Sequence, residues 1–140
     1  MITTNKISIT VKAYIDAPVE KVWEFWTSPE HIIRWNNASD DWHTPIAEND
    51  LRAGGKFFSR MESKDGKMGF DFTGEYTKIE LHKTIHYIIG DGRKVQISFQ
   101  TNANKTVVTE TFDAEEINSP ELQKEGWQSI LNNFKKYVEH

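Results

Sequence analysis

Glu110 is the residue whose position in the sequence most directly suggests chemistry. It lies in the middle of residues 106–112, Thr-Val-Val-Thr-Glu-Thr-Phe, a run typical of a β-strand. Alternation places Glu110 on one face with Val108 and Phe112, and a valine and two threonines on the other face. Both faces are mixed, so periodicity alone leaves open whether Glu110 faces the interior or the solvent.

An inward-facing Glu110 would have specific chemical consequences. Burial in apolar surroundings disfavours the charged carboxylate and raises its pKa. Such a carboxyl can act as a general acid or base, or it can hold a polar group of a ligand. The more ordinary alternative is a structural acid paired with an arginine, for which Arg60 and Arg93 are the candidates.

Other residue types that support catalysis or metal binding lack the spacing that such sites require. His43 lies beside Trp42 and is either a donor at a pocket mouth or an ordinary surface histidine. The remaining histidines match no metal-binding pattern, and we expect no metal and no cofactor. No serine stands in a nucleophile-elbow context. Gly54 and Gly55 precede a strand and lack the Lys-Ser/Thr of a phosphate-binding loop.

Length and composition predict one domain, residues 1–140, with an aromatic-rich interior. A net charge of −4 gives no electrostatic footprint for nucleic acid. Cysteine is absent and no apolar run suits a signal peptide or membrane insertion, so we expect a cytoplasmic protein. Five Trp, eight Phe and four Tyr fit either a solid aromatic core or a cavity lined by aromatic rings.

The final segment, residues 119–140, predicts a long helix around which the rest of the chain is organised. Ser119 is a good N-cap, and Pro120 suits the first helical position. A helix here would gather its apolar residues on one broad face, formed by Leu122, Gly126, Trp127, Ile130, Leu131, Phe134 and Val138. A helix this one-sided should lie on a large apolar surface.

Gly126 is unusual because a glycine inside a helix costs about 1 kcal/mol relative to alanine. Close packing against a strand is the simpler interpretation. The alternative is that Gly126 leaves room for a ligand between the helix and the sheet.

The remaining chain predicts an α+β domain in which helices cover an antiparallel sheet. Residues 6–15 alternate as a half-buried strand, and two short helices follow, one from Asp16-Ala17-Pro18 and one over residues 28–35. Residues 35–50 show no period and predict a long loop. Five or so strands follow, near residues 54–62, 70–79, 84–89, 95–100 and 106–112, with turn signals at residues 64–67 and 90–92.

Four motifs occur in an order that resembles a known family. They are residues 16–23 (Asp-Ala-Pro-Val-Glu-Lys-Val-Trp), 50–57 (Asp-Leu-Arg-Ala-Gly-Gly-Lys-Phe), 74–76 (Gly-Glu-Tyr) and 125–131 (Glu-Gly-Trp-Gln-Ser-Ile-Leu). Together the motifs resemble the START-like (SRPBCC) superfamily, and within it the branch named after the activator of the heat-shock protein 90 ATPase. The resemblance implies the helix-grip fold: a curved antiparallel sheet wrapped around a long C-terminal helix, with two short helices after the first strand. It also implies a deep pocket between the sheet and the last helix.

The resemblance favours an inward Glu110, because the family usually carries apolar, inward-facing residues at the positions of Val108, Glu110 and Phe112. Family phase and alternation together predict a ligand-binding cavity. Its expected residues are Trp23, Trp26, Trp42, His43, Phe57, Met61, Phe72, Tyr76, Tyr87, Ile97, Phe99, Val108, Glu110, Trp127, Ile130 and Leu131.

Three functions are consistent with this sequence. The first is a binding protein for a small hydrophobic, aromatic or lipid-like molecule, which we favour over catalysis. The second is an enzyme of the cyclase or hydrolase kind using the same cavity. The third and weakest is an interaction with a chaperone ATPase. The sequence predicts neither an oligomeric state nor the identity of the ligand.

Overall fold

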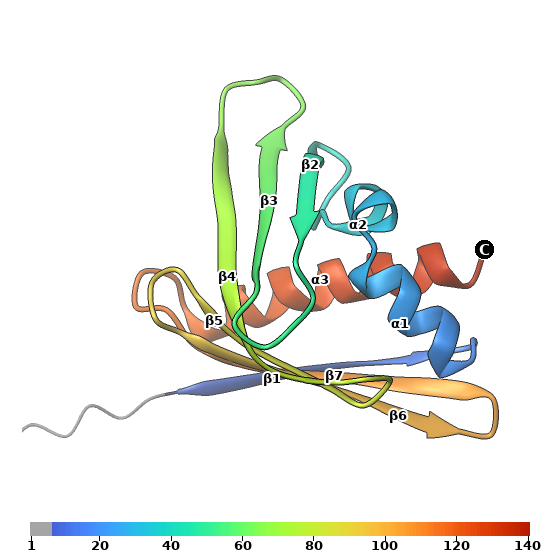
Figure 1. The fold of residues 1–140 in the computed structure, drawn as a ribbon. Coiled ribbons are helices and arrows are strands. Elements are labelled where there is room, and N and C mark those ends of the chain that lie inside the picture. Colours follow the sequence, from blue (N-terminus) through green and yellow to red (C-terminus); the bar gives the residue numbers. More distant parts are fainter. Residues whose placement is uncertain (1–6) are drawn as a thin grey trace, which may run out of the picture.

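The computed structural model describes residues 7–140, which form a single sheet and three helices (Figure 1). In chain order the elements are β1 (Ser8–Ile15), α1 (Val19–Thr27), α2 (Pro29–Trp35), β2 (Trp42–Asn49), β3 (Lys56–Ser63), β4 (Gly69–Glu80), β5 (Thr84–Ile89), β6 (Lys94–Asn102), β7 (Lys105–Asp113) and α3 (Pro120–Val138). The helix-grip architecture predicted from the sequence is therefore confirmed.

The seven strands are antiparallel throughout and follow the spatial order β1-β7-β6-β5-β4-β3-β2. Strands β2 to β7 form a meander, and β1 adds to its far edge beside β7. The sheet curls strongly, so that β4, β3 and β2 stand away from the layer of β1, β7 and β6, with α3 running across the curve (Figure 1). Two of the tight turns use glycine in the left-handed region, Gly66 at φ 76° and Gly92 at φ 96°.

The prediction of a loop over residues 35–50 is wrong for its second half, which forms strand β2. The register of β2 with β3 shifts between His43 and Ile46, at Pro45. Proline has no N–H to donate and is tolerated in a sheet only at edges and irregularities, and β2 is an edge strand. This irregularity removes the alternation that would have revealed the strand.

Helix α3 packs on the sheet mainly through the middle and end of its apolar face. Leu131, Phe134 and Val138 have no exposed surface, and the ring of Phe134 meets Trp26 and Trp35 edge-on at 4.8 Å between centroids in each pair. The predicted cap is present, since the Ser119 hydroxyl accepts a hydrogen bond from the Leu122 N–H at 3.2 Å.

The predicted apolar face is wrong in the first turn of α3. Leu122 is 55% exposed, whereas its neighbour Gln123 is buried. The Gln123 side chain accepts from the Glu115 N–H at 2.8 Å and donates to the carbonyl oxygens of Glu115 and Asn118. An amide in this position satisfies the backbone of the preceding loop, which leucine could not do.

We predict that Phe134→Ala lowers the free energy of unfolding by about 3–5 kcal/mol, because it leaves a cavity among packed aromatic rings. Leu122→Ala on the same helix is the matched control and should change stability by less than about 0.5 kcal/mol. Urea denaturation of both variants tests this. Equal losses in the two variants would contradict the observed packing of α3.

Candidate functional site

A cavity of about 520 Å³ lies between the curled sheet, α2 and the first half of α3. Its wall is mainly aromatic and aliphatic, with a small number of polar groups, as is usual for small-molecule sites. The lining consists of Trp26, Ile32, Trp35, Asn36, Ala38, Glu48, Asn49, Phe57, Ser59, Met61, Phe70, Phe72, Tyr76, Ile85, Tyr87, Arg93, Glu110, Glu115, Asn118, Gln123, Gly126, Trp127 and Ile130.

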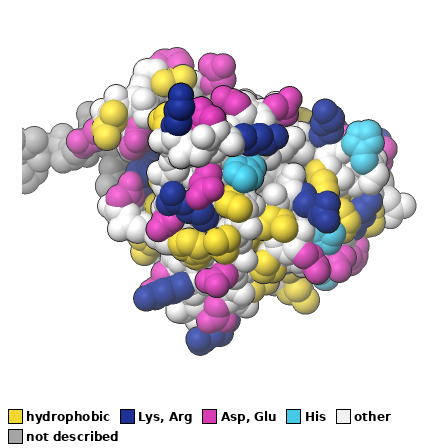
Figure 2. All heavy atoms as spheres, turned by 90° about the horizontal axis from the view of Figure 1, so that it is seen from above, with side chains coloured by type: hydrophobic (Ala, Val, Ile, Leu, Met, Phe, Trp, Pro, Cys, Tyr) yellow, Lys and Arg dark blue, Asp and Glu magenta, His cyan; other side chains and the backbone are white. Residues whose placement is uncertain are grey.

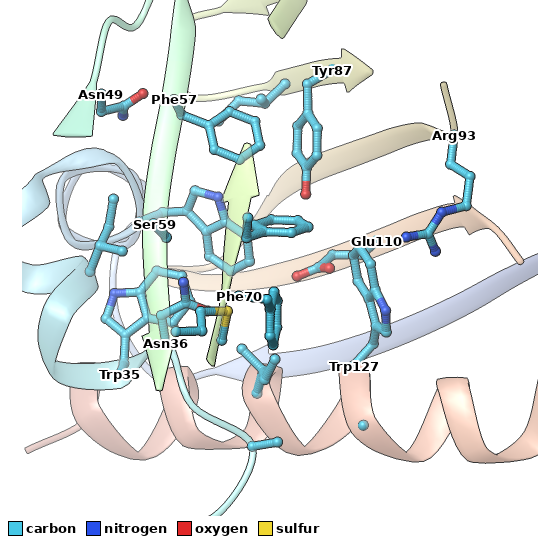
Figure 3. Close-up of a pocket in the computed structure, with 18 of the residues that line it drawn as sticks. Trp35, Asn36, Asn49, Phe57, Ser59, Phe70, Tyr87, Arg93, Glu110 and Trp127 are labelled. Atoms are coloured by element: carbon cyan, nitrogen blue, oxygen red, sulfur yellow. The ribbon is translucent and has the colours of Figure 1, made fainter. Parts of the chain in front are cut away.

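The aromatic part of the wall is a contiguous cluster carried by β3, β4 and β5. The ring of Phe57 contacts Tyr87 edge-on at 4.8 Å and lies 5.5 Å from Phe72 and 5.4 Å from Tyr76. Trp127 of α3 extends the wall, because its ring packs nearly perpendicular to that of Phe72 with 6.5 Å between centroids. Figure 3 shows the labelled Phe57, Tyr87 and Trp127 arranged around one open space.

Glu110 faces this cavity, and the inward phase of β7 is correct. Its cross-strand partners are Val11 on β1 and Ile97 on β6, both fully buried, and Glu110 itself is only 5% exposed. Because β7 is paired on both sides, its register fixes the direction of the side chain. Desolvation in this setting raises the pKa of Glu110 to about 8, so most of the carboxyl is protonated at neutral pH.

Within residues 7–140 the Glu110 carboxyl has no hydrogen-bond or ion-pair partner. Every side-chain oxygen or nitrogen in this range that is completely enclosed by protein does have a hydrogen-bond partner, so the Glu110 oxygens are not completely enclosed. Its oxygens therefore border the open volume of the cavity. Figure 3 shows the Tyr87 hydroxyl directed toward the carboxyl, whereas Arg93 lies on the side from which the carboxyl points away. The Arg93 Nε is already 2.8 Å from an Asp91 carboxylate oxygen, with which it forms an ion pair.

A second polar position is built from Tyr76 and Asn49. The Tyr76 hydroxyl donates to Asn49 Oδ1 at 2.6 Å, and Asn49 Nδ2 donates to the Thr27 carbonyl oxygen at 2.7 Å. Burial raises the pKa of the Tyr76 hydroxyl, which therefore stays a neutral donor. These bonds tie β4 and the edge strand β2 to the end of α1, and they hold this end of the cavity wall.

Gly126 lies on the cavity side of α3, and the close-packing interpretation of this residue is wrong. A β-carbon built at Gly126 would have no neighbouring atom within 4 Å. The space beside it belongs to the cavity. The glycine thus leaves open volume, as the alternative interpretation required.

Several residues predicted for the cavity do line it, all of them on the concave side of the fold. They are Trp26, Phe57, Met61, Phe72, Tyr76, Tyr87, Glu110, Trp127 and Ile130. Five more predicted residues face the interior but lie outside the lining: Trp23, Ile97, Phe99, Val108 and Leu131. They are packed where the helices meet the sheet, as when Trp23 of α1 contacts Phe99 of β6 edge-on with 5.1 Å between ring centroids.

Trp42 and His43 do not line the cavity, which corrects the predicted pocket mouth. Thr44 is the buried residue of this segment, and its hydroxyl donates to the Asn36 carbonyl oxygen. Trp42 contacts the Phe70 ring at 6.0 Å, and His43 lies 3.8 Å from Glu62 with 43% of its side chain exposed. Trp42 therefore packs against a side chain of β4 and His43 against one of β3, and neither reaches the cavity wall.

The lining residues that the sequence analysis missed come mainly from segments whose periodicity carried no signal. Asn36 and Ala38 belong to the loop before β2, Glu48 and Asn49 belong to the part of the predicted loop that forms β2, and Glu115, Asn118 and Gln123 surround the start of α3. The other missed residues are Ile32, Trp35, Ser59, Phe70, Ile85 and Arg93. Trp35 and Ile85 were detectable as apolar residues of predicted elements.

Within residues 7–140 no cluster of histidine, aspartate or glutamate is arranged to hold a metal ion. No helix in this range is long and apolar enough to cross a membrane.

On the face from which the β3–β4 hairpin rises, hydrophobic side chains gather among acidic and basic groups (Figure 2).

The fold and cavity define a START-type helix-grip domain, a class that commonly binds ligands. Residues 16–139 match the model of the family described as activator of Hsp90 ATPase homolog 1-like protein, and the chain belongs to that family.

Solved structures agree with this assignment. An AHSA1-like protein from Aeromonas hydrophila is 46% identical at a TM-score of 0.90, and the match covers 95% of this chain and 92% of that one. A protein from Cytophaga hutchinsonii is 51% identical at a TM-score of 0.83, and the match covers 94% of this chain and 92% of that one. A protein from Nitrosomonas europaea, 20% identical at a TM-score of 0.80 with 94% of each chain covered, shares the fold. A comparison with curated proteins finds no match.

We predict that Glu110 makes the protein less stable as pH rises. Its pKa is about 8 in the folded protein against a usual value of 4.5, so between these values the folded state binds more protons than the unfolded state. The wild type should therefore lose stability relative to Glu110→Gln across this range, by up to about 1.4 kcal/mol per pH unit. Glu110→Val should be at least as stable as the wild type at pH 7, because it removes a desolvated acid.

Urea denaturation at pH 5, 7 and 9 measures these differences. Glu121→Gln, an exposed acid in the first turn of α3, is the control and should leave the pH profile unchanged. Parallel profiles for the wild type and Glu110→Gln would mean that Glu110 titrates as a solvent-exposed acid.

Proposed function

We propose that this protein binds a small hydrophobic molecule with an aromatic or lipid-like body in the cavity between the sheet and α3. The single observation that carries the proposal is the open space beside Gly126, in a cavity whose wall also contains the aromatic cluster and the unpartnered Glu110. A glycine that costs helix stability but makes no close contact is explained if its missing side chain leaves volume for a ligand.

The chemistry of the lining supports binding more than catalysis. Acid–base catalysis usually employs titratable groups within hydrogen-bond reach of one another. Among the hydrogen bonds and ion pairs of residues 7–140, none joins Glu110 to a second titratable group. A cyclase- or hydrolase-like activity therefore remains the alternative, and an interaction with a chaperone ATPase remains a prediction from family resemblance.

The ligand can be sought directly. Native mass spectrometry of the protein purified from its own host should reveal a co-purifying small molecule of low polarity. Titration with an aromatic probe such as a flavonoid should show saturable binding. For a probe that interacts with the carboxyl, Glu110→Gln should weaken the binding free energy by about 1–3 kcal/mol.

We predict that enlarging residue 126 blocks the cavity without unfolding the protein. Gly126→Leu should lower the affinity for the aromatic probe at least tenfold, since the new side chain occupies the open volume. Gly126→Ala is the matched control: both variants should gain up to about 1 kcal/mol of helix stability, but alanine should reduce binding far less. Thermal melting and probe titration of both variants provide the test. Full probe affinity in a stable Gly126→Leu protein would place the binding site elsewhere.

A further inference from the structure

The charged groups that line the cavity are mostly acidic. Glu48 of β2, Glu110 of β7 and Glu115 of the loop before α3 all contribute to the wall. Among the described residues, Arg93 is the one basic group in the lining, and its Nε is already engaged by Asp91 at 2.8 Å. An anionic ligand would therefore find little positive charge in the wall, and it would meet the charge of Glu110 wherever that carboxyl is ionised.

Every element packed around Glu110 leaves its carboxyl without a neutralising partner. The neighbouring positions on β1 and β6 are Val11 and Ile97, and the α3 residues of the lining carry no charge. The titratable groups of the lining on β4 and β5 are the phenols of Tyr76 and Tyr87, and the turn before β6 supplies Arg93. A carboxyl that is 95% buried, unpartnered and directed into an open cavity is a position for a ligand group.

Aromatic rings lie beside this carboxyl, and such surroundings suit a cation in particular. Trp127 stacks on Phe112 with 3.9 Å between ring centroids, and its edge meets Phe72, so large rings are fixed beside Glu110. Figure 3 shows Trp127 and Tyr87 on two sides of the carboxyl. A positive charge gains from the negative face of such rings as well as from the carboxylate, and aromatic sites of this composition recognise organic ammonium groups.

We propose that the cavity selects ligands in which an apolar body carries a positively charged nitrogen, with the nitrogen seated between Glu110 and the rings of Trp127 and Tyr87. This inference rests on the proposed function, because it names the class of ligand for the same cavity. The apolar body would occupy the space between Gly126 and the Phe57–Phe72 wall.

A protonation linkage follows from this arrangement. Desolvation raises the pKa of Glu110 to about 8, so binding of a cation at neutral pH releases the carboxyl proton to solvent. Affinity for a cation of fixed charge should rise about tenfold between pH 7 and pH 9, as the ionised fraction grows from about one tenth to nearly complete. The affinity for an anion should fall over the same pH range. The affinity for a neutral ligand should change little or fall.

Three matched probes test the proposal by isothermal titration calorimetry at pH 7 and pH 9. They are naphthylmethyl-trimethylammonium, whose charge is independent of pH, neutral naphthylacetamide, and anionic naphthylacetate. We expect the ammonium probe to bind at least tenfold more tightly than the acetate at pH 9 and to show the predicted pH slope. Calorimetry in two buffers of different ionisation enthalpy should also detect close to one released proton at pH 7.

Glu110→Gln should abolish both the ammonium preference and its pH slope while it changes affinity for the amide only a few-fold. Glu121→Gln, exposed on α3, is the control and should behave as the wild type. If Glu110→Gln fails to fold, Glu110→Val supplies the same comparison, and the pH slopes of the wild type remain a test without any variant. Equal or tighter binding of the acetate would overturn the inference but leave the proposed function intact. Failure of all three probes to bind would count against the proposed function itself.

Discussion

The packing of the second half of α3 against β1, α1 and α2 is the constraint on which the rest of the structure depends. Phe134 lies between two tryptophans, and the Asn133 side chain donates to the Trp35 carbonyl oxygen at 2.8 Å. At the C-terminal end of the helix, Glu139 accepts the Asp16 N–H at 2.8 Å. These contacts fix the direction of α3, so its first half is held above the curled sheet and the cavity lies beneath it.

The position of Glu110 shows how a sheet can hold an unfavourable group in place. Strand β7 is hydrogen-bonded to β1 on one side and β6 on the other, and a slip of one residue would turn Val108 and Phe112 outward together with the acid. The burial of those two apolar side chains outweighs the cost of one desolvated carboxyl. The carboxyl therefore remains directed into the cavity even where its charge is disfavoured.

Much of this architecture was predictable because regular alternation and helix signals report burial directly. The alternation of β1, the cap at Ser119 and the turns at Gly66 and Gly92 all had local sequence signals. Strand β2 had none, because Pro45 interrupts its register, and Gln123 is buried for hydrogen bonds to a loop that no pattern describes. The inward phase of Glu110 needed family resemblance, since both faces of β7 are mixed. Periodicity predicts which side chains face the interior. It does not predict which of them border open space, because this depends on where the helices cover the sheet.

The division of α3 into a packed half and a half above the cavity also has an evolutionary consequence. The buried anchors, Leu131, Phe134 and Val138, follow the helix positions that border the cavity, of which Gly126 has free space around it. Mutations in the earlier turns can therefore alter the shape of the cavity while the anchors maintain the fold. Such a division would let the shape of the cavity change at Gly126 while the buried anchors stay as they are. For protein design, Gly126 is the position in this half of the helix where a side chain can be added into open space.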